Sequence, residues 1–145
     1  MKKILKKQKN HCLIINLAFV VDTHALIWFL TKNKKLGKNA LNKLKLADEN
    51  KESIIIPSIV LAEIFYICEN KRMVLDFDRI LDKIENSSNY LIYDLNLEVI
   101  KKLKELTKIR ELHDRIIAAI ALLSDSKILT KDEKIASSNY VEVIW

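Results

Sequence analysis

The sequence is poor in glycine and proline. Its 145 residues include one glycine, Gly37, and one proline, Pro57. Glycine-rich phosphate loops and the glycine turns of β-hairpins are therefore unavailable. This scarcity argues against all-β folds, P-loop NTPases and dinucleotide-binding Rossmann enzymes, and it favours long helices joined by short polar connections.

Cysteine is also scarce. Cys12 and Cys68 are far apart, and neither belongs to a CxxC pair or lies close to a histidine. No zinc site or disulfide framework is indicated, and a reducing cytoplasm is the expected compartment. The basic start and the apolar stretch after it imitate a secretory signal, but Asn16 interrupts that stretch and no small-residue cleavage site precedes Asp22. The stretch is too short to span a bilayer, so we expect no membrane association.

Apolar and charged residues, in contrast, are plentiful. Half of the chain is apolar, 30% is charged and the net charge is +6. A core of good size is available, and the positive charge attracts polyanions such as RNA, DNA or an acidic protein. No linker-like segment divides the chain. We therefore expect a single domain at residues 19–145, preceded by a basic and apolar extension at residues 1–18.

Apolar runs typical of buried strands alternate with helical patterns. Strands are expected at residues 13–21, 53–56, 90–93, 127–130 and 140–144. The alternation predicts an α/β fold, a three-layer α/β/α sandwich around a central parallel sheet of four to five strands. Ser58 is expected to cap a buried helix that carries Glu63, and Asp94 a helix with apolar residues at three-residue steps, Leu97, Ile100, Leu103 and Leu106.

Four acidic residues are placed to meet at one edge of this sheet. Asp22 follows the first strand, Glu63 lies in the helix after the second, Asp114 opens the helix before the fourth, and Asp132 lies two residues beyond Thr130. Ligands of open α/β sheets bind outside the carboxyl ends of the strands. Clustered carboxylates resist joint ionisation, and a divalent cation removes that cost.

The residue types also indicate a reaction. Oxygen ligands favour Mg²⁺ or Mn²⁺, with Asp22, Asp114 and Asp132 as the expected metal ligands. The natural chemistry is hydrolysis of a phosphodiester by water, in which the metal lowers the pKa of its water and orients the phosphate. Lysines and Arg115 would hold the polyanion.

Structural explanations stand beside these functional ones. Each aspartate taken alone is better explained as a helix N-cap, although capping does not require three of them on one edge. Glu63 is either a site residue or part of a structural salt bridge, and Arg115 either binds phosphate or pairs with Glu111. Thr23 and Thr130 are either strand-end residues or hydroxyl ligands of the site, and the structural role is favoured for both. For His24 and His113 a helix-start or core role is favoured over a ligand role. Core or dimer contacts are favoured over base stacking for four aromatic residues, Trp28, Phe29, Phe65 and Tyr66.

Four segments together resemble the motifs of PIN-domain proteins, in particular the VapC toxins of bacterial and archaeal toxin–antitoxin pairs. They are residues 20–28 (VVDTHALIW), Pro57-Ser58 with 61–64 (LAEI), 112–119 (LHDRIIAA) and 129–132 (LTKD), in the family's order. Each is weak alone, and the four in order are strong. The resemblance runs from about Phe19 to the C-terminus, and Glu111 stands where related sequences often carry aspartate.

The resemblance implies a PIN-like sandwich and an endoribonuclease dependent on Mg²⁺ or Mn²⁺, the toxin of a toxin–antitoxin pair. It also implies a homodimer and a cognate antitoxin as partner. By the same resemblance Asp22, Glu63, Asp114 and Asp132 form the catalytic acidic site, with Thr23 and Thr130 close by.

Two other classes of protein remain as competing hypotheses. In a non-catalytic PIN-like module for RNA or protein binding, the acids are caps and the basic surface docks a partner without cutting it. A response-regulator-like receiver also places acids at strand ends, but it expects an acidic pair near the first strand and a lysine after the last. The sequence has no convincing arrangement of that kind.

Overall fold

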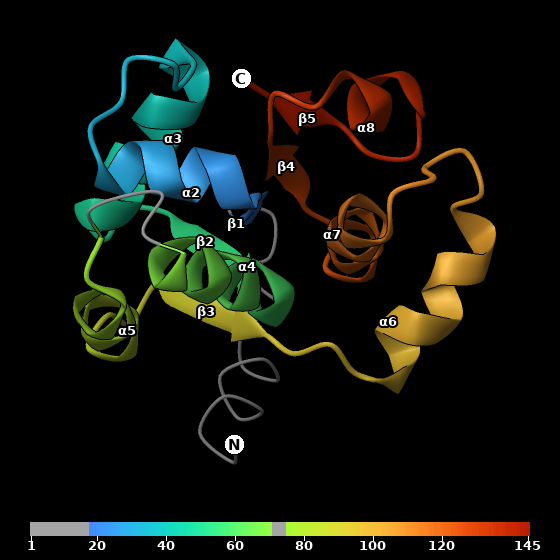
Figure 1. The fold of residues 1–145 in the computed structure, drawn as a ribbon. Helices are drawn as coiled ribbons and strands as arrows, with labels where there is room; N and C mark the ends of the chain where they lie inside the picture. The colour runs from blue at the N-terminus through green and yellow to red at the C-terminus, as the bar shows by residue number, and fades with distance from the viewer. Residues whose placement is uncertain (1–17, 71–74) are drawn as a thin grey trace.

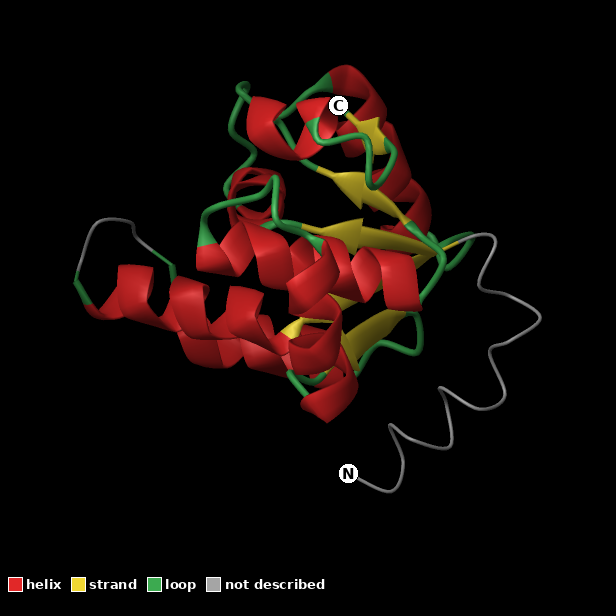
Figure 2. Ribbon diagram, turned by 90° about the vertical axis from the view of Figure 1, so that its right-hand side faces the viewer, coloured by secondary structure: helices red, strands yellow, loops and turns green. Residues whose placement is uncertain are grey.

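The computed structural model describes residues 18–70 and 75–145. Five parallel strands form one sheet in the order β3-β2-β1-β4-β5. The strands are β1 (Ala18–Val21), β2 (Ser53–Pro57), β3 (Tyr90–Tyr93), β4 (Lys127–Leu129) and β5 (Val143–Ile144). In Figure 2 they lie side by side and point the same way. The part of the expected first strand before Ala18, with most of the expected extension, lies outside the described residues.

Helices cover both faces of the sheet. Figure 1 looks along the strands and shows α2, α3 and α5 on one side and α6, α7 and α8 on the other, while α4 extends forward from the end of β2. Their bounds are α2 (Thr23–Leu30), α3 (Lys38–Asp48), α4 (Ser58–Glu69), α5 (Phe77–Glu85), α6 (Leu97–Lys102), α7 (Leu112–Leu123) and α8 (Glu133–Ser137), with a 3-10 turn, η2 (Leu103–Glu105). The predicted α/β/α sandwich around a parallel sheet is confirmed.

The core lies where the sheet meets these helices. The central strands β1 and β2 are buried along their whole length, which is why their sequences are apolar without alternation. Residues 116–121 of α7 are all buried, because small alanines there let the helix approach the sheet closely. The crossover from β1 to β2 builds one helical layer and the return from β3 to β4 builds the other. This reversal next to β1 places the carboxyl ends of β1 and β4 at one open edge.

The structure corrects three details of the expected helices. Ser58 is the first residue of α4 and not its cap, and its hydroxyl accepts a hydrogen bond from the Leu95 N–H at 3.1 Å. The helix itself is only partly buried, since Val60 and Ile64 alone among its residues are classed as buried. The residue that caps α6 is Asn96 and not Asp94, because the Asn96 side chain reaches the N–H of Val99.

The burial of the apolar residues after residue 96 also differs from the expected pattern. Leu97 and Ile100 are exposed, whereas Val99 and Leu106 are fully buried. The three-residue steps therefore do not follow burial in this segment, where Val99 of α6 and Leu106 after η2 are the buried positions. None of the helices in the described residues is long and apolar enough to cross a membrane.

Candidate functional site

A cleft of about 640 Å³ opens at the carboxyl ends of β1 and β4. Six acidic side chains line it: Asp22, Glu63, Glu111, Asp114, Asp132 and Glu133. They come from four elements, the starts of α2, α7 and α8 and the middle of α4. Thr23, His24, Trp28, His113, Ile117 and Lys131 complete the lining. The four acids expected to meet therefore share one cleft.

Asp22 is held at the end of β1 by two hydrogen bonds. Its Oδ1 accepts from the N–H of Ala25 at 2.7 Å, so it caps α2, and its Oδ2 accepts from the hydroxyl of Thr130. Thr130 is only 1% exposed, and its Oγ1 also accepts from the Asp132 N–H at 3.0 Å. One threonine thus links the acids that follow two neighbouring strands.

Asp132 combines its place in the cleft with a capping role. Its Oδ1 accepts from the N–H groups of Lys134 and Ile135 at 2.8 and 3.0 Å, at the start of α8. At α7 the cap is Glu111 and not Asp114, since Glu111 Oε2 accepts from the Asp114 N–H at 3.0 Å. Asp114 lies in the first turn of α7, and the capping explanation does not apply to it.

Burial and neighbouring charges act on the acid–base behaviour of this cleft. Partial burial raises the pKa of Asp114 to about 6, and the nearby Asp132, Glu111, Asp22 and Glu63 add to the rise. Burial also raises the pKa of Asp22, against the stabilising hydrogen bonds from Thr130 and Ala25. The ionised cleft is therefore electrostatically costly, as expected for gathered carboxylates.

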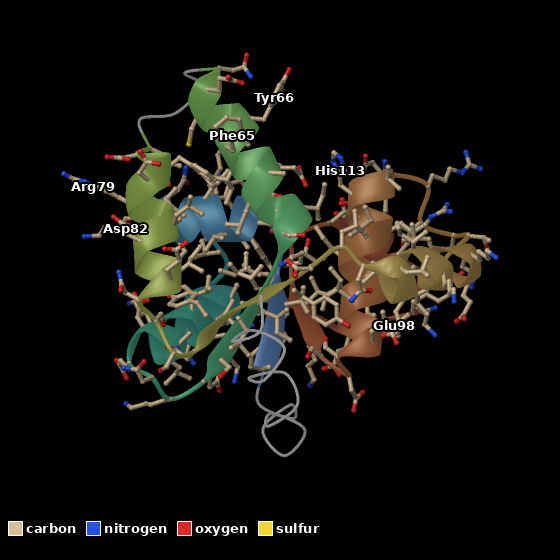
Figure 3. All side chains as sticks on the ribbon, turned by 90° about the horizontal axis from the view of Figure 1, so that it is seen from below. Phe65, Tyr66, Arg79, Asp82, Glu98 and His113 are labelled. Carbon is tan, nitrogen blue, oxygen red and sulfur yellow. The ribbon has the colours of Figure 1, made fainter. Side chains whose placement is uncertain are left out.

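Glu63 reaches the cleft from α4, whereas His113 and Asp114 belong to α7. Its Oε1 lies 3.6 Å from Nδ1 of His113, which belongs to α7. Figure 3 shows His113 on α7 beside α4, with Phe65 and Tyr66 on the part of α4 that extends further outward. Those two aromatic residues are 48% and 63% exposed and are not core residues. The contact between Glu63 and His113 thus joins α4 to α7 within the lining of the acidic cleft.

The carboxylates share the cleft without closing on a common point. Within residues 18–70 and 75–145, no three histidine, cysteine or acidic side chains form a group that could hold a metal ion as they stand. The capping bonds account for this, because they direct oxygens of Asp22, Asp132 and Glu111 toward helix N-termini. The donor set, oxygen atoms from several acids, nevertheless suits a hard cation.

Thr23 carries a buried hydroxyl group beside the cleft that has no hydrogen-bond partner among the described residues. Its side chain lines the cleft and is 4% exposed. Buried hydroxyl groups are almost always hydrogen-bonded to protein or to ordered water. The Thr23 hydroxyl is an exception to this rule among the described residues.

Arg115 does not join the cleft. Its Nε donates to the carbonyl oxygen of Ile109 at 2.6 Å, and the ion pair with Glu111, one of the two alternatives for Arg115, is not found among the described residues. The sequence analysis missed Lys131 and favoured a core or dimer role for Trp28, although both line the cleft. The four-residue step from His24 to Trp28 puts both on one helix face and is the signal that identifies Trp28.

Comparison with known proteins extends these observations. Residues 19–138 match the family model of the PIN domain. None of the curated proteins matches the chain. Among solved structures, the chain is similar to VapBC2 from Rickettsia felis bound to a DNA fragment from their promoter, with a TM-score of 0.66 and 22% identity over 88% of this chain and 97% of that chain.

A toxin–antitoxin complex from Klebsiella pneumoniae is also similar, with a TM-score of 0.64 and 17% identity over 88% of this chain and 96% of that chain. At these identities the two likenesses show the fold alone. The match to the family model shows more than the fold, because it spans most of the chain and includes every acid of the cleft. The chain belongs to the PIN domain family.

Proposed function

We propose that this chain is a VapC-like toxin, a metal-dependent endoribonuclease that hydrolyses RNA phosphodiester bonds. The observation that carries the proposal is the gathering of six acidic side chains in one cleft, where partial burial and then repulsion from the neighbouring acids raise the pKa of Asp114 to about 6. A fold gains nothing from such repulsion unless a cation or a reaction makes use of it. The net charge of +6 suits a polyanionic substrate.

Each residue of the cleft has its own role in the proposed reaction. Asp22, Asp114 and Asp132 would hold Mg²⁺ or Mn²⁺, which when bound supplies a water of lowered pKa and offsets charge on the phosphate. Thr130 keeps Asp22 and Asp132 in a fixed relation, and the caps fix the starts of α2 and α8. Glu63 would complete the acidic set, oriented by His113.

The proposed partners follow from the same assignment. Both similar structures are toxin–antitoxin assemblies by their descriptions, which supports a cognate antitoxin for this chain. An antitoxin or a second copy needs apolar surface to bury, and Leu97, Ile100 and Leu112 are 64%, 49% and 56% exposed. A homodimer and an antitoxin are therefore part of the proposal, and the reducing cytoplasm is the proposed compartment.

One observation favours the alternative, a non-catalytic module that binds RNA or protein. Asp22, Asp132 and Glu111 all have capping bonds, which would suffice to explain those three residues. The two functions differ in whether RNA is cut, so a cleavage assay separates them.

The test is incubation of labelled single-stranded RNA with the protein in Mg²⁺ or in EDTA. We expect cleavage in Mg²⁺ alone, and a loss of about 100-fold or more in Asp22→Asn, with its circular dichroism unchanged. Glu142→Gln, an exposed acid in a surface ion pair with Lys127, is the matched control and should cut as the wild type does. RNA that is bound but not cut by the wild type supports the module instead. Sequencing of RNA ends from cells expressing both forms identifies the target.

A further inference from the structure

Trp28 lies between two clefts of opposite charge. It lines the acidic cleft, and it also lines a second cleft of about 690 Å³ between α2, α3 and α5. Four lysines, Lys32, Lys34, Lys45 and Lys83, line this second cleft, with Asp48 as its only acid. A chain of phosphates leaving the acidic cleft past Trp28 would therefore reach a region of positive charge.

The indole ring of Trp28 is held in place without being enclosed. The ring of Trp145 packs edge-on against it with centroids 5.8 Å apart, and the ring of His24 lies 5.6 Å away. Trp28 itself is only partly buried, at the surface of the core. A rigid aromatic ring that is exposed to a cleft loses little entropy when a ligand stacks on it.

Two lysine side chains lie near this ring, at a distance where their attraction to it is weak. The Nζ atoms of Lys35 and Lys131 each lie 6.0 Å from the centre of the Trp28 ring, at the outer limit of cation–π attraction. Both side chains are exposed, and Lys131 precedes Asp132 in the acidic cleft. A planar group could displace either ammonium group from the ring, and the displaced ammonium group could then pair with a phosphate.

We propose that Trp28 is the stacking surface for a base of single-stranded RNA next to the carboxylate cleft, and that the strand continues into the lysine-lined cleft. The inference rests on the proposed function for its substrate class. An aromatic ring with flanking lysines is the combination that binds single strands through bases and phosphates together. Paired bases of a duplex are already stacked on their neighbours, so an unpaired base is required.

The first measurement asks whether a base contacts the ring. In Trp145→Phe, Trp28 is the one remaining tryptophan of the sequence. Titration with short oligoadenylate in EDTA should quench its fluorescence, and an abasic oligomer of equal length and charge should not. Equal quenching by both oligomers would overturn the proposal. Quenching by neither oligomer would also overturn it, and this is the result expected if Trp28 contacts a protein partner instead.

The second measurement compares affinities by anisotropy of the same two oligomers, labelled. The wild type should bind oligoadenylate about tenfold more tightly than the abasic oligomer, a typical contribution of one stacked base. Trp28→Leu should lose this preference while it still binds both oligomers in a salt-dependent way, and Trp28→Phe should keep most of it. Tyr66→Leu removes an aromatic residue that is 63% exposed on α4 and should leave the preference unchanged.

The outcome is independent of cleavage, because EDTA is present throughout. A preference for bases that Trp28→Leu abolishes supports stacking even in a protein that never cuts RNA, and the nuclease assignment then fails alone. In the opposite case the protein cuts RNA in Mg²⁺, but Trp28→Leu and Trp28→Phe keep the wild-type preference for bases. The proposed function then stands, and the stacking surface is ruled out.

Discussion

Thr130 and Asp22 are separated by 108 residues in the chain and are joined by a hydrogen bond from the threonine hydroxyl to Oδ2 of the aspartate. The same hydroxyl accepts from the backbone N–H of Asp132 at 3.0 Å. Thr130 itself is almost wholly buried, so its hydroxyl has these two groups as its partners and little contact with solvent. This residue therefore sets the relation between two acids of the cleft.

Replacing Thr130 by valine should show what its two hydrogen bonds contribute apart from the packing of the side chain. Valine has the shape of threonine but no hydroxyl, so Asp22 Oδ2 and the Asp132 N–H both lose a partner. We expect a loss of about 1–3 kcal/mol in the free energy of unfolding, measured by urea denaturation, and weaker RNA cleavage. Thr130→Ser keeps the hydroxyl and should retain most of the cleavage activity. Full activity in Thr130→Val would show that the link does not position the acids.

The raised pKa of Asp114 predicts a pH dependence of stability in EDTA. The pKa of Asp114 is about 6 in the folded chain and has its ordinary value of 3.8 in the unfolded chain. Between these values the folded state binds more protons, so its stability falls as pH rises through this window. Asp114→Asn cannot ionise and should lack this contribution.

The measurement is urea denaturation of both forms from pH 4 to pH 7. We expect Asp114→Asn to gain stability relative to the wild type as pH rises, and the gain to level off above about pH 6. Asp125→Asn, which alters an exposed aspartate, should follow the wild type at every pH. A difference between wild type and Asp114→Asn that stays constant over this range would contradict the burial and repulsion inferred for Asp114.

Asp132→Asn should distinguish a metal ligand from a helix cap. Asparagine caps helices about as well as aspartate, so the variant should fold with near wild-type stability in EDTA. In Mg²⁺ the wild type should be stabilised, by about 2.7 kcal/mol at a concentration 100 times the Kd, and the variant by much less. Differential scanning calorimetry measures both. Equal stabilisation of the two proteins would leave Asp132 with its capping role only.

Gly37→Ala should disturb the C-terminal tryptophan. A Cβ atom at Gly37 would lie 2.6 Å from the backbone carbon of Trp145 and 2.7 Å from its ring, so Trp145 must move. We expect a loss of about 1–3 kcal/mol in stability from this overpacking, with a change in tryptophan fluorescence as the contact with Trp28 is altered. Lys38→Ala, at the exposed neighbouring position, should change neither quantity.

The elements of the fold were largely predictable from local sequence. The apolar runs at 53–56, 90–93 and 127–130 correspond to β2, β3 and β4. The reason is clearest for β2, which is buried along its whole length and therefore has apolar side chains on both faces. Helix starts were less predictable. Asp94, Asn96 and Ser58 are all suitable caps by type, and the chain direction after each strand decided which of them is used.

Burial was less predictable than secondary structure. The sequence of α4 is apolar almost all round, yet Phe65 and Tyr66 are exposed, because the helix extends beyond the sheet and has neighbours on only part of its surface (Figure 3). Leu97 and Ile100 are exposed although they recur at a three-residue step, since periodicity does not say what covers a helix.

The sequence by itself determined which acids follow strands and therefore which side chains gather at one edge, because parallel strands place their carboxyl ends together. Tertiary structure alone decided that Thr130 joins Asp22, that Glu111 caps the helix carrying Asp114, and that Trp28 lies between an acidic and a basic cleft. These relations depend on the spacing and rotation of helices packed from distant parts of the chain. Local patterns of hydrophobicity carry no information on either quantity.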